Sequence, residues 1–254
     1  MISSTPHIDG VLFDLGNTLV PFTPRDSMEF VLKWYYSTPG LEELVPFPDF
    51  LETFRSVVRE ERGKMRAMKW ETNVRTRSQM IEDRLIGHGF GVKGYSKPLE
   101  ATHTGAFTSC LRIGPHSEYV LGKLSTMRGA SGQLLKLGLV SNAGDGEAIR
   151  QFLERSGLSS FFLSVVISGE VGVAKPWEDI FRIALDEMDL DSRNASYVGD
   201  RYEVDVIGSR NVGMRPVYIR EYHTAGEPPP GIEIDAPTIE NILDLIPLIE
   251  SGSI

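Results

Sequence analysis

The order of hydrophobic and polar residues divides the 254-residue chain into three parts of different texture. A short apolar run over residues 8–14 ends in an acid and predicts a buried strand. From Arg25 to Cys110, apolar residues recur at helical spacing among many charges, which predicts roughly four helices and few strands. Beyond residue 112, short apolar runs alternate with amphipathic stretches as far as residue 250. We therefore expect one strand, a helical block and then a regular alternation.

The alternating part predicts a parallel sheet that is covered on both faces. Strands are expected at 134–142, 161–169, 195–200 and 215–220, and helices at 117–127, 145–157, 176–190, 203–213 and 238–250. Strands that alternate with helices form βαβ units, whose crossovers place helices over a parallel sheet. The predicted fold class is α/β, with a doubly wound, Rossmann-like core and an inserted all-helical domain. Residues 1–21 and 112–254 are assigned to the core, and residues 22–111 to the insert.

Polar residues follow the predicted strands at their carboxyl ends. In chain order these residues are Asp14, Ser141, Asn142, Lys175, Asp200 and, shortly after it, Asp205. The carboxyl ends of parallel strands meet at one edge of the sheet, where ligands bind at the topological switch point. Each residue alone could cap a helix or end a turn. Their joint placement instead predicts a site with one hydroxyl, one amine and several carboxylates.

Four short motifs carry a resemblance to a known family. They are FDLGNTL (13–19), LVSN (139–142), GVAKP (172–176) and VGDRYEVD (198–205). In this order they resemble the motifs of the haloacid dehalogenase (HAD) superfamily of aspartate-nucleophile hydrolases, and the resemblance covers almost the whole chain. The insert sits where that family has its helical C1 cap. The resemblance implies a phosphatase that acts on a small phosphorylated metabolite.

The resemblance also implies a role for each motif residue. Asp14 is the expected nucleophile, which attacks phosphorus and forms an aspartyl-phosphate. Ser141 donates its hydroxyl to a phosphoryl oxygen, and Lys175 neutralises charge between the nucleophile and the phosphoryl group. The expected cofactor is Mg²⁺, a hard cation that takes oxygen ligands. Its expected ligands are Asp14, the backbone carbonyl of Gly16, Asp200 and Asp205.

Two of these residues have a second candidate role. Asp205 either holds a water on the metal or orients Lys175. Asn142 is expected to contact substrate, and a purely structural role remains open.

Gly16 departs from the phosphatase pattern. In phosphatases of this superfamily, the position two residues after the nucleophile is usually a second aspartate that serves as general acid and base. The loss of such a group typically lowers the rate by ~10²–10⁴-fold. Two alternatives follow. One is a carbon–phosphorus hydrolase resembling phosphonoacetaldehyde hydrolases, for which Lys64 is a candidate Schiff-base lysine. The other is a weakly catalytic domain that binds phosphometabolites.

The stretch 61–75 is the best candidate in the insert for substrate contact, through Lys69, Trp70 and Arg75. A charged helix end in solvent is the competing interpretation. The histidines at positions 7, 88, 103, 116 and 223 show no metal-ligand spacing, so we expect them in loops or on the surface.

The amino-acid composition bears on the expected binding partners and on the expected cellular location. The net charge of -9 and the pI near 5.1 argue against a basic surface that would bind nucleic acid or an anionic membrane. Cys110 is the single cysteine, which excludes an intramolecular disulfide. No apolar run approaches the ~20 residues that span a bilayer, and the N-terminus lacks the layout of a secretory signal. We therefore expect a cytoplasmic protein. The oligomeric state does not follow from the sequence.

Overall fold

The sheet at the centre of the structure confirms the α/β fold class. The computed structural model describes residues 8–68, 71–222, 228 and 231–254. Six strands pair in the order β3-β2-β1-β4-β5-β6, and every described pairing is parallel. The strands are β1 (Gly10–Phe13), β2 (Lys136–Ser141), β3 (Ser164–Ile167), β4 (Ala195–Gly199), β5 (Arg215–Ile219) and β6 (Thr238–Ile239). The strand order reverses at β1, so the switch point of the doubly wound sheet lies between β1 and β4.

β1 occupies the centre of the sheet because it is apolar on both faces. All four of its residues are buried. Gly10 pairs with Lys136 of β2 on one side and with Ala195 of β4 on the other. A strand that is covered on both faces is expected to be continuously apolar, and residues 10–13 have that character. Asp14 follows directly, so the chain delivers a carboxylate to the carboxyl edge of the sheet.

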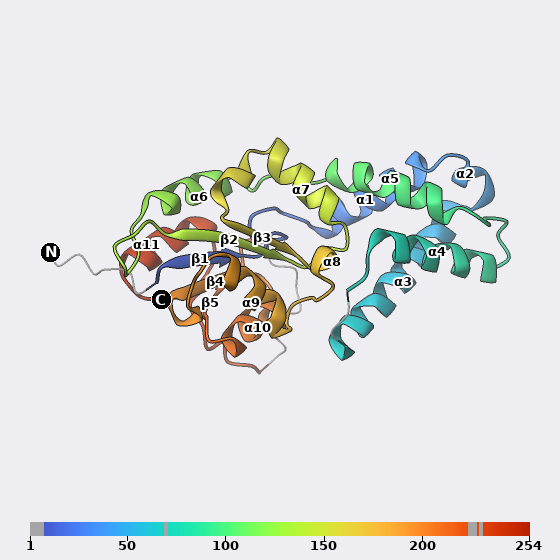
Figure 1. Ribbon diagram of the computed structural model, residues 1–254. Helices are drawn as coiled ribbons and strands as arrows, with labels where there is room; N and C mark the ends of the chain where they lie inside the picture. The colour runs from blue at the N-terminus through green and yellow to red at the C-terminus, as the bar shows by residue number, and fades with distance from the viewer. Residues whose placement is uncertain (1–7, 69–70, 223–227, 229–230) are drawn as a thin grey trace.

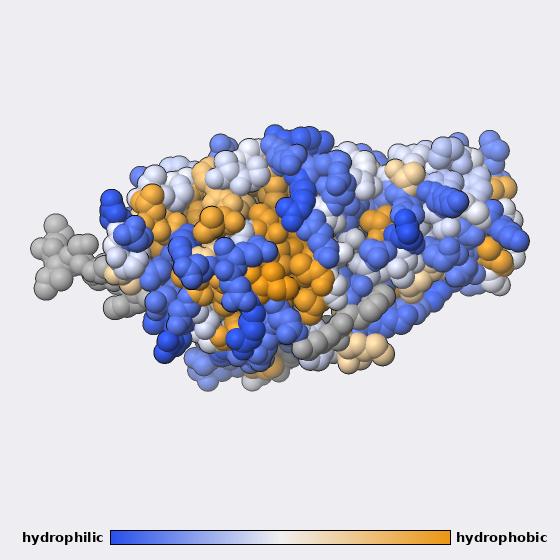
Figure 2. All heavy atoms as spheres, in the orientation of Figure 1, coloured by the Kyte–Doolittle hydropathy of each residue, from blue (hydrophilic) through white to orange (hydrophobic). Residues whose placement is uncertain are grey.

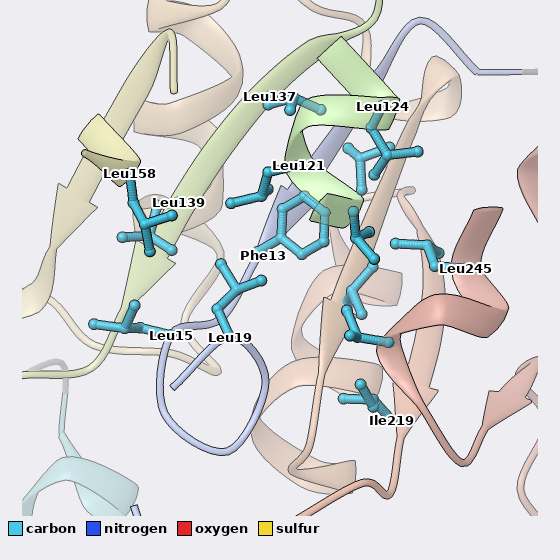
Figure 3. Close-up of a cluster of buried hydrophobic side chains, with 14 of the residues drawn as sticks. Phe13, Leu15, Leu19, Leu121, Leu124, Leu137, Leu139, Leu158, Ile219 and Leu245 are labelled. Carbon is cyan, nitrogen blue, oxygen red and sulfur yellow. The ribbon is translucent and has the colours of Figure 1, made fainter. Parts of the chain in front are cut away.

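Helices cover both faces of this sheet (Figure 1). One face carries α6 (Ser117–Thr126), α7 (Gly146–Arg155) and α11 (Leu245–Glu250), and the other carries α9 (Glu178–Glu187) with α10 (Gly208–Asn211) beside it. Phe13 points to the first face, where Figure 3 shows it among Leu121, Leu124 and Leu245. Leu12 points to the second face. Full burial of such a side chain stabilises the folded state by roughly 1.5–3 kcal/mol. The packing of Phe13 and Leu12 against the helices on the two faces therefore holds β1 in place.

The helical block lies together at one end of the molecule (Figure 1). It contains α1 (Pro24–Ser37), α2 (Leu41–Leu44), α3 (Phe47–Ala67), α4 (Val74–Gly87) and α5 (Ser96–Thr108). Thr23 starts α1 with a capping box, because its side chain accepts from the Asp26 N–H while Asp26 accepts from the Thr23 N–H. The block has its own hydrophobic cluster, which includes Phe30, Trp34 and Phe50. We call residues 22–111 the cap.

Two segments near the C-terminus differ from the sequence expectation. Residues 238–250 are not one helix, because Thr238 and Ile239 pair with the edge strand β5 as β6. Asn241 then starts a 3₁₀ turn, η4 (Ile242–Asp244), through a capping box before α11 begins. Residues 202–207 form a π-helix, η3 (Tyr202–Ile207), ahead of α10. The remaining short elements are η1 (Leu158–Phe161), α8 (Ser168–Val171) and η2 (Ser192–Asn194).

The surface differs between the core and the cap. Figure 2 shows hydrophobic residues gathered on the core around β3 in this view, while the cap is mostly hydrophilic on the same face. The apolar residues of the cap instead pack inward in its own cluster. Within the described part of the chain, no helix has the length and apolar character needed to span a membrane.

Candidate active site

The amine of Lys175 joins three polar groups at the carboxyl edge of the sheet. Its Nζ donates hydrogen bonds to Asp14 Oδ1 at 2.8 Å, to Asp205 Oδ1 at 2.7 Å and to the Tyr197 hydroxyl at 2.7 Å. Because an ammonium group has three donors, these contacts use all of them. The Lys175 residue is only 2% exposed. The amine therefore fixes the carboxylates that leave the ends of β1 and β4 relative to one another.

The local structure around β4 explains how Asp200 and Asp205 come to lie beside Asp14. Asp200 follows the last residue of β4, and Asp205 lies in η3, which begins two residues later. Asp205 packs against Gly199, where an added Cβ would overlap its carboxylate carbon. Glycine is therefore required at position 199 for this close approach. The Gly-Asp motif thus places both acids within reach of β1.

Asn142 holds Lys175 from the backbone side. Its Nδ2 donates to the Lys175 carbonyl at 2.9 Å, and its Oδ1 accepts from the Lys175 N–H at 2.8 Å. Both polar atoms of the amide are engaged in this way. The structure therefore gives Asn142 a positioning role, and the residue also lines the cavity above the site, so the substrate contact expected from the sequence stays a prediction.

The acids at the site carry more negative charge than Lys175 balances. Burial raises the pKa of Asp14, and the neighbouring Asp205 carboxylate adds to the effect. Burial, followed by repulsion from Asp14 and Asp205, raises the pKa of Asp200 to about 8. Burial alone would lower the pKa of Lys175, but Asp14 and Asp205 outweigh it and raise that pKa. The site therefore combines one stable cation with an excess of acid.

The raised pKa of Asp200 makes the stability of the metal-free protein depend on pH. Between about pH 4 and about pH 8, the folded state holds a proton on Asp200 that the unfolded chain releases. The contribution of Asp200 to stability is therefore present at low pH and is lost as the pH rises to about 8. We expect the melting temperature in EDTA to fall over this range, and to fall less in Asp200→Asn. Identical pH slopes in the two proteins would contradict the assignment.

The same cluster fits a divalent cation. Carboxylate oxygens of Asp14, Asp200 and Asp205 all lie within 4.8 Å of one another. Three buried acids share the Lys175 ammonium, and the repulsion that raises the pKa of Asp200 is what a bound cation would relieve. Hard cations such as Mg²⁺ take oxygen ligands of this kind. Asp14 and Asp200 are the better direct ligands, because Asp205 already accepts from Lys175 and, through Oδ2, from the Arg201 N–H at 3.0 Å.

A cavity of about 390 Å³ opens over these groups between the core and the cap. The core supplies the floor, with Asp14, Gly16, Ser141, Lys175 and Asp200. The cap supplies walls that are part aromatic and part charged, from Phe30, Phe54, Glu61, Arg62, Met65, Glu71, Arg77, His103 and Phe107. A cavity of this size suits a small molecule. The stretch 61–75 therefore contributes to the cavity, as the sequence suggests, through Glu61, Arg62, Met65 and Glu71.

The residues predicted from the sequence as substrate contacts within that stretch do not line this cavity where the structure describes them. Arg75 is not among the cavity-lining residues, since its side chain is 82% exposed and its Nε donates to Glu100 Oε1 at 3.2 Å. Lys69 and Trp70 lie outside the described residues. Lys64 pairs with Glu60 at 2.7 Å on the half-exposed side of α3 and is also absent from the cavity wall.

Sequence reasoning missed two features of the cap wall. His103 was expected in a loop or on the surface, but it is 1% exposed on α5 and lines the cavity. Its spacing from the buried residues Leu99 and Ala106 places it on the inner stripe of that helix, which is the signal that could have identified it. Arg77 holds the buried Glu61 carboxylate with Nε at 3.1 Å from both oxygens. That contact joins α3 to α4, so it required the tertiary structure.

Known proteins share this sequence pattern and fold. A family model for haloacid dehalogenase-like hydrolases matches residues 110–219. Glyceraldehyde 3-phosphate phosphatase of Methanocaldococcus jannaschii is 26% identical over 220 residues, which cover 84% of this chain and 85% of that protein. Pyrimidine 5'-nucleotidase YjjG of Escherichia coli is 40% identical over 105 residues, or 41% of this chain and 44% of that protein.

The fold is shared with a solved hydrolase structure. YfnB of Bacillus subtilis, a HAD hydrolase determined with magnesium bound, has a TM-score of 0.69 at 16% identity. The similarity covers 95% of this chain and 98% of that one, so it includes both the core and the cap. The matching family model, the relative that spans most of the chain and the shared fold agree. Together they support a place for this chain among the haloacid dehalogenase-like hydrolases, with the family match itself confined to residues 110–219.

Proposed function

We propose that the protein is a Mg²⁺-dependent phosphatase that hydrolyses a small phosphorylated metabolite through an aspartyl-phosphate on Asp14. One observation carries this proposal, namely the buried cluster in which Lys175 joins Asp14 to Asp205 with Asp200 alongside. An excess of acid around a single amine suits a site that must receive a cation together with an anionic substrate. The phosphatase and nucleotidase named among the relatives support the same class of substrate.

In the first step, an Asp14 carboxylate oxygen attacks phosphorus and the bond from phosphorus to the ester oxygen breaks. The ester oxygen leaves with the bonding electrons and takes a proton from solvent. Ser141 donates its hydroxyl to a phosphoryl oxygen, and Lys175 holds the Asp14 carboxylate in place and offsets the negative charge. Catalysis of phosphoryl transfer depends mainly on such positioning and electrostatics.

In the second step, water attacks the phosphorus of the aspartyl-phosphate. The bond from phosphorus to Asp14 breaks, which releases inorganic phosphate and restores the carboxylate. Most phosphatases of this kind place an acid two residues after the nucleophile for both proton transfers, but this chain has Gly16. Substrates whose leaving group departs without protonation, such as acyl and aryl phosphates, are therefore expected to react fastest.

When bound, Mg²⁺ neutralises charge between the nucleophile and the phosphoryl group. We assign its protein ligands as the Asp14 and Asp200 carboxylates and the Gly16 carbonyl, with Asp205 behind them. Turnover of a panel of phosphate esters, measured with Mg²⁺ and with EDTA, tests the proposal directly. Binding that needs the metal but leads to no turnover would instead support a phosphometabolite-binding domain.

A carbon–phosphorus hydrolase is the alternative that the same site could serve. That reaction needs a lysine amine at the substrate carbonyl, and the candidate Lys64 is paired with Glu60 away from the cavity wall. Incubation with phosphonoacetaldehyde and borohydride distinguishes the two activities. Covalent trapping of the substrate on the protein would favour the carbon–phosphorus hydrolase over the phosphatase.

The two acids that follow β4 are expected to differ in their effect on Mg²⁺ dependence. Asp200→Asn removes a direct ligand, so the Mg²⁺ concentration for half-maximal activity is expected to rise by about 10-fold or more. Asp205→Asn is the matched control, because it removes charge from a side chain that holds Lys175 and the Arg201 N–H. It is expected to lower kcat with a smaller change in Mg²⁺ dependence. Equal metal dependence in the two variants would show that these roles are misassigned.

A further inference from the structure

The segment that carries Ser141 is tied down at each residue that follows it. We call residues 141–145 the Ser141 loop. Asn142 binds the Lys175 backbone through two hydrogen bonds, as described above. The N–H of Ala143 donates to the Ser168 hydroxyl at 2.9 Å. The loop is thus anchored to the core on one side, and Ser141 and Lys175 are connected through it.

The cap reaches this loop first through Glu71. The Ser168 hydroxyl, which accepts from Ala143, donates its own proton to Glu71 Oε2 at 2.6 Å. Glu71 Oε1 accepts from the Thr72 N–H at 2.8 Å, so the carboxylate is oriented by its own chain. Burial raises the pKa of Glu71. A continuous set of hydrogen bonds therefore runs from the cap through Ser168 to the Ser141 loop.

The cap backbone also packs directly on the loop. A Cβ added at Gly144 would lie 2.9 Å from the Thr72 carbonyl oxygen. That distance is too short for a side chain, so only glycine permits the contact. The cap segment 71–72 therefore contacts both Ala143, through Ser168, and Gly144.

A second part of the cap holds the end of the loop. His103 Nδ1 lies 2.7 Å from Asp145 Oδ2, and the Thr104 hydroxyl donates to the same oxygen at 2.9 Å. Burial would raise the pKa of Asp145, but its hydrogen bonds from His103 and from the Ala148 N–H outweigh burial and lower that pKa. Asp145 is thus an anion that can only accept, so the imidazole donates. Asp145 also caps α7, which fixes the loop to the start of that helix.

We propose that Glu71 and His103 are positioning residues, through which the docked cap sets the Ser141 loop for phosphoryl transfer. The inference rests on the proposed phosphatase function. Ser141 must donate to a phosphoryl oxygen, and Asn142 of the same loop fixes the backbone of Lys175. A misplacement of about 1 Å can cost about 10²-fold in rate. The cap thus contributes to catalysis even for a substrate too small to contact its walls.

Acetyl phosphate is the appropriate probe, because its organic part is minimal and its leaving group needs no proton. Glu71→Met removes the acceptor for Ser168 and is expected to lower kcat by about 10- to 100-fold. Glu71→Gln keeps one acceptor oxygen for Ser168 but turns its amide nitrogen toward the Thr72 N–H, so it is expected to lose less kcat than Glu71→Met. Trp177→Phe is the matched control, since it removes a hydrogen bond from the core to the Met65 carbonyl of the cap away from the loop. It is expected to stay close to wild type.

A second readout does not require turnover. Calorimetric binding of inorganic phosphate in the presence of Mg²⁺ is expected to weaken in Glu71→Met and to persist in Trp177→Phe. Equal losses of phosphate binding in Glu71→Met and Trp177→Phe would overturn the inference. They would show that a weakened contact anywhere between cap and core has the same effect as loss of the Glu71 contact. Wild-type behaviour of Glu71→Met would overturn it as well. If the wild type hydrolysed no ester at all, the proposed function would fail, and phosphate binding would still decide the positioning role.

Thr104→Val tests the other contact if Glu71→Met does not fold. It removes one donor to Asp145 and leaves His103 and the cap of α7 in place. The expected result is a smaller loss of kcat in the same direction, together with weaker phosphate binding. An unchanged kcat with unchanged phosphate binding in a folded Thr104→Val protein would count against the inference.

Discussion

Replacing Asp14 by asparagine is expected to abolish turnover of every phosphate ester, with a loss of at least about 10³-fold in kcat. An amide keeps the shape of the side chain but cannot attack phosphorus, and it removes an anionic group from the proposed metal site. The measurement is the initial rate with acetyl phosphate and p-nitrophenyl phosphate at saturating Mg²⁺. Retention of more than a few per cent of the activity would show that another group is the nucleophile.

The fold is expected to survive this substitution. Lys175 keeps its hydrogen bonds to Asp205 and Tyr197. Burial raises the pKa of Asp14, which means that the ionised acid is costly to bury in the absence of metal. A neutral amide relieves that cost. The melting temperature of Asp14→Asn in EDTA should therefore equal or exceed that of the wild type, which separates loss of chemistry from loss of structure.

Gly16→Asp is expected to give the largest gain of activity, and only with alkyl phosphates. The wild type should hydrolyse acyl and aryl phosphates much faster than sn-glycerol 3-phosphate, because negative charge must build on the departing oxygen. An acid at position 16 can protonate that oxygen, an effect typically worth ~10²–10⁴-fold. A Cβ added at Gly16 meets no atom within 4 Å, and the glycine is not among the residues with positive φ. The backbone therefore accepts the substitution.

Gly16→Asn is the matched control for this gain. It adds a side chain of the same size that cannot transfer a proton as an acid, so the dependence on the leaving group should stay steep. The experiment is a leaving-group series for the three proteins at one Mg²⁺ concentration, with burst kinetics to detect accumulated aspartyl-phosphate. A flat series for the wild type would mean that a different residue supplies the proton.

The floor of the site could be anticipated because strand ends are local features of the sequence. Apolar runs locate β1, β2 and β4, and a polar residue directly after such a run is delivered to the carboxyl edge whatever surrounds it. Asp14, Ser141 and Asp200 follow from this rule alone. Lys175 sits beyond a turn, and its place beside Asp14 was inferred from the order of the motifs.

The cap walls could not be anticipated in the same way. A helical pattern shows which stripe of a helix is buried, but it does not show whether that stripe meets its own cluster or the cavity. Arg75 and His103 illustrate the two errors, since one points to solvent and the other lines the cavity. The role of Asn142 depends on its distance to the Lys175 backbone, and β6 depends on the exposed edge of β5. Each of these requires contacts between distant parts of the chain.

The central position of β1 affects how the chain must fold during synthesis. Gly10 is synthesised before both of its partners in the sheet, Lys136 and Ala195. Long-range parallel pairing of this kind is slow to form, because chain closure comes before any stabilising contact. The cap has its own hydrophobic cluster, so it can become compact before β1 has paired with β2 and β4. We expect β1 to remain unprotected from hydrogen exchange on one edge until β4 has been synthesised, and a nascent chain that lacks β4 to have no site.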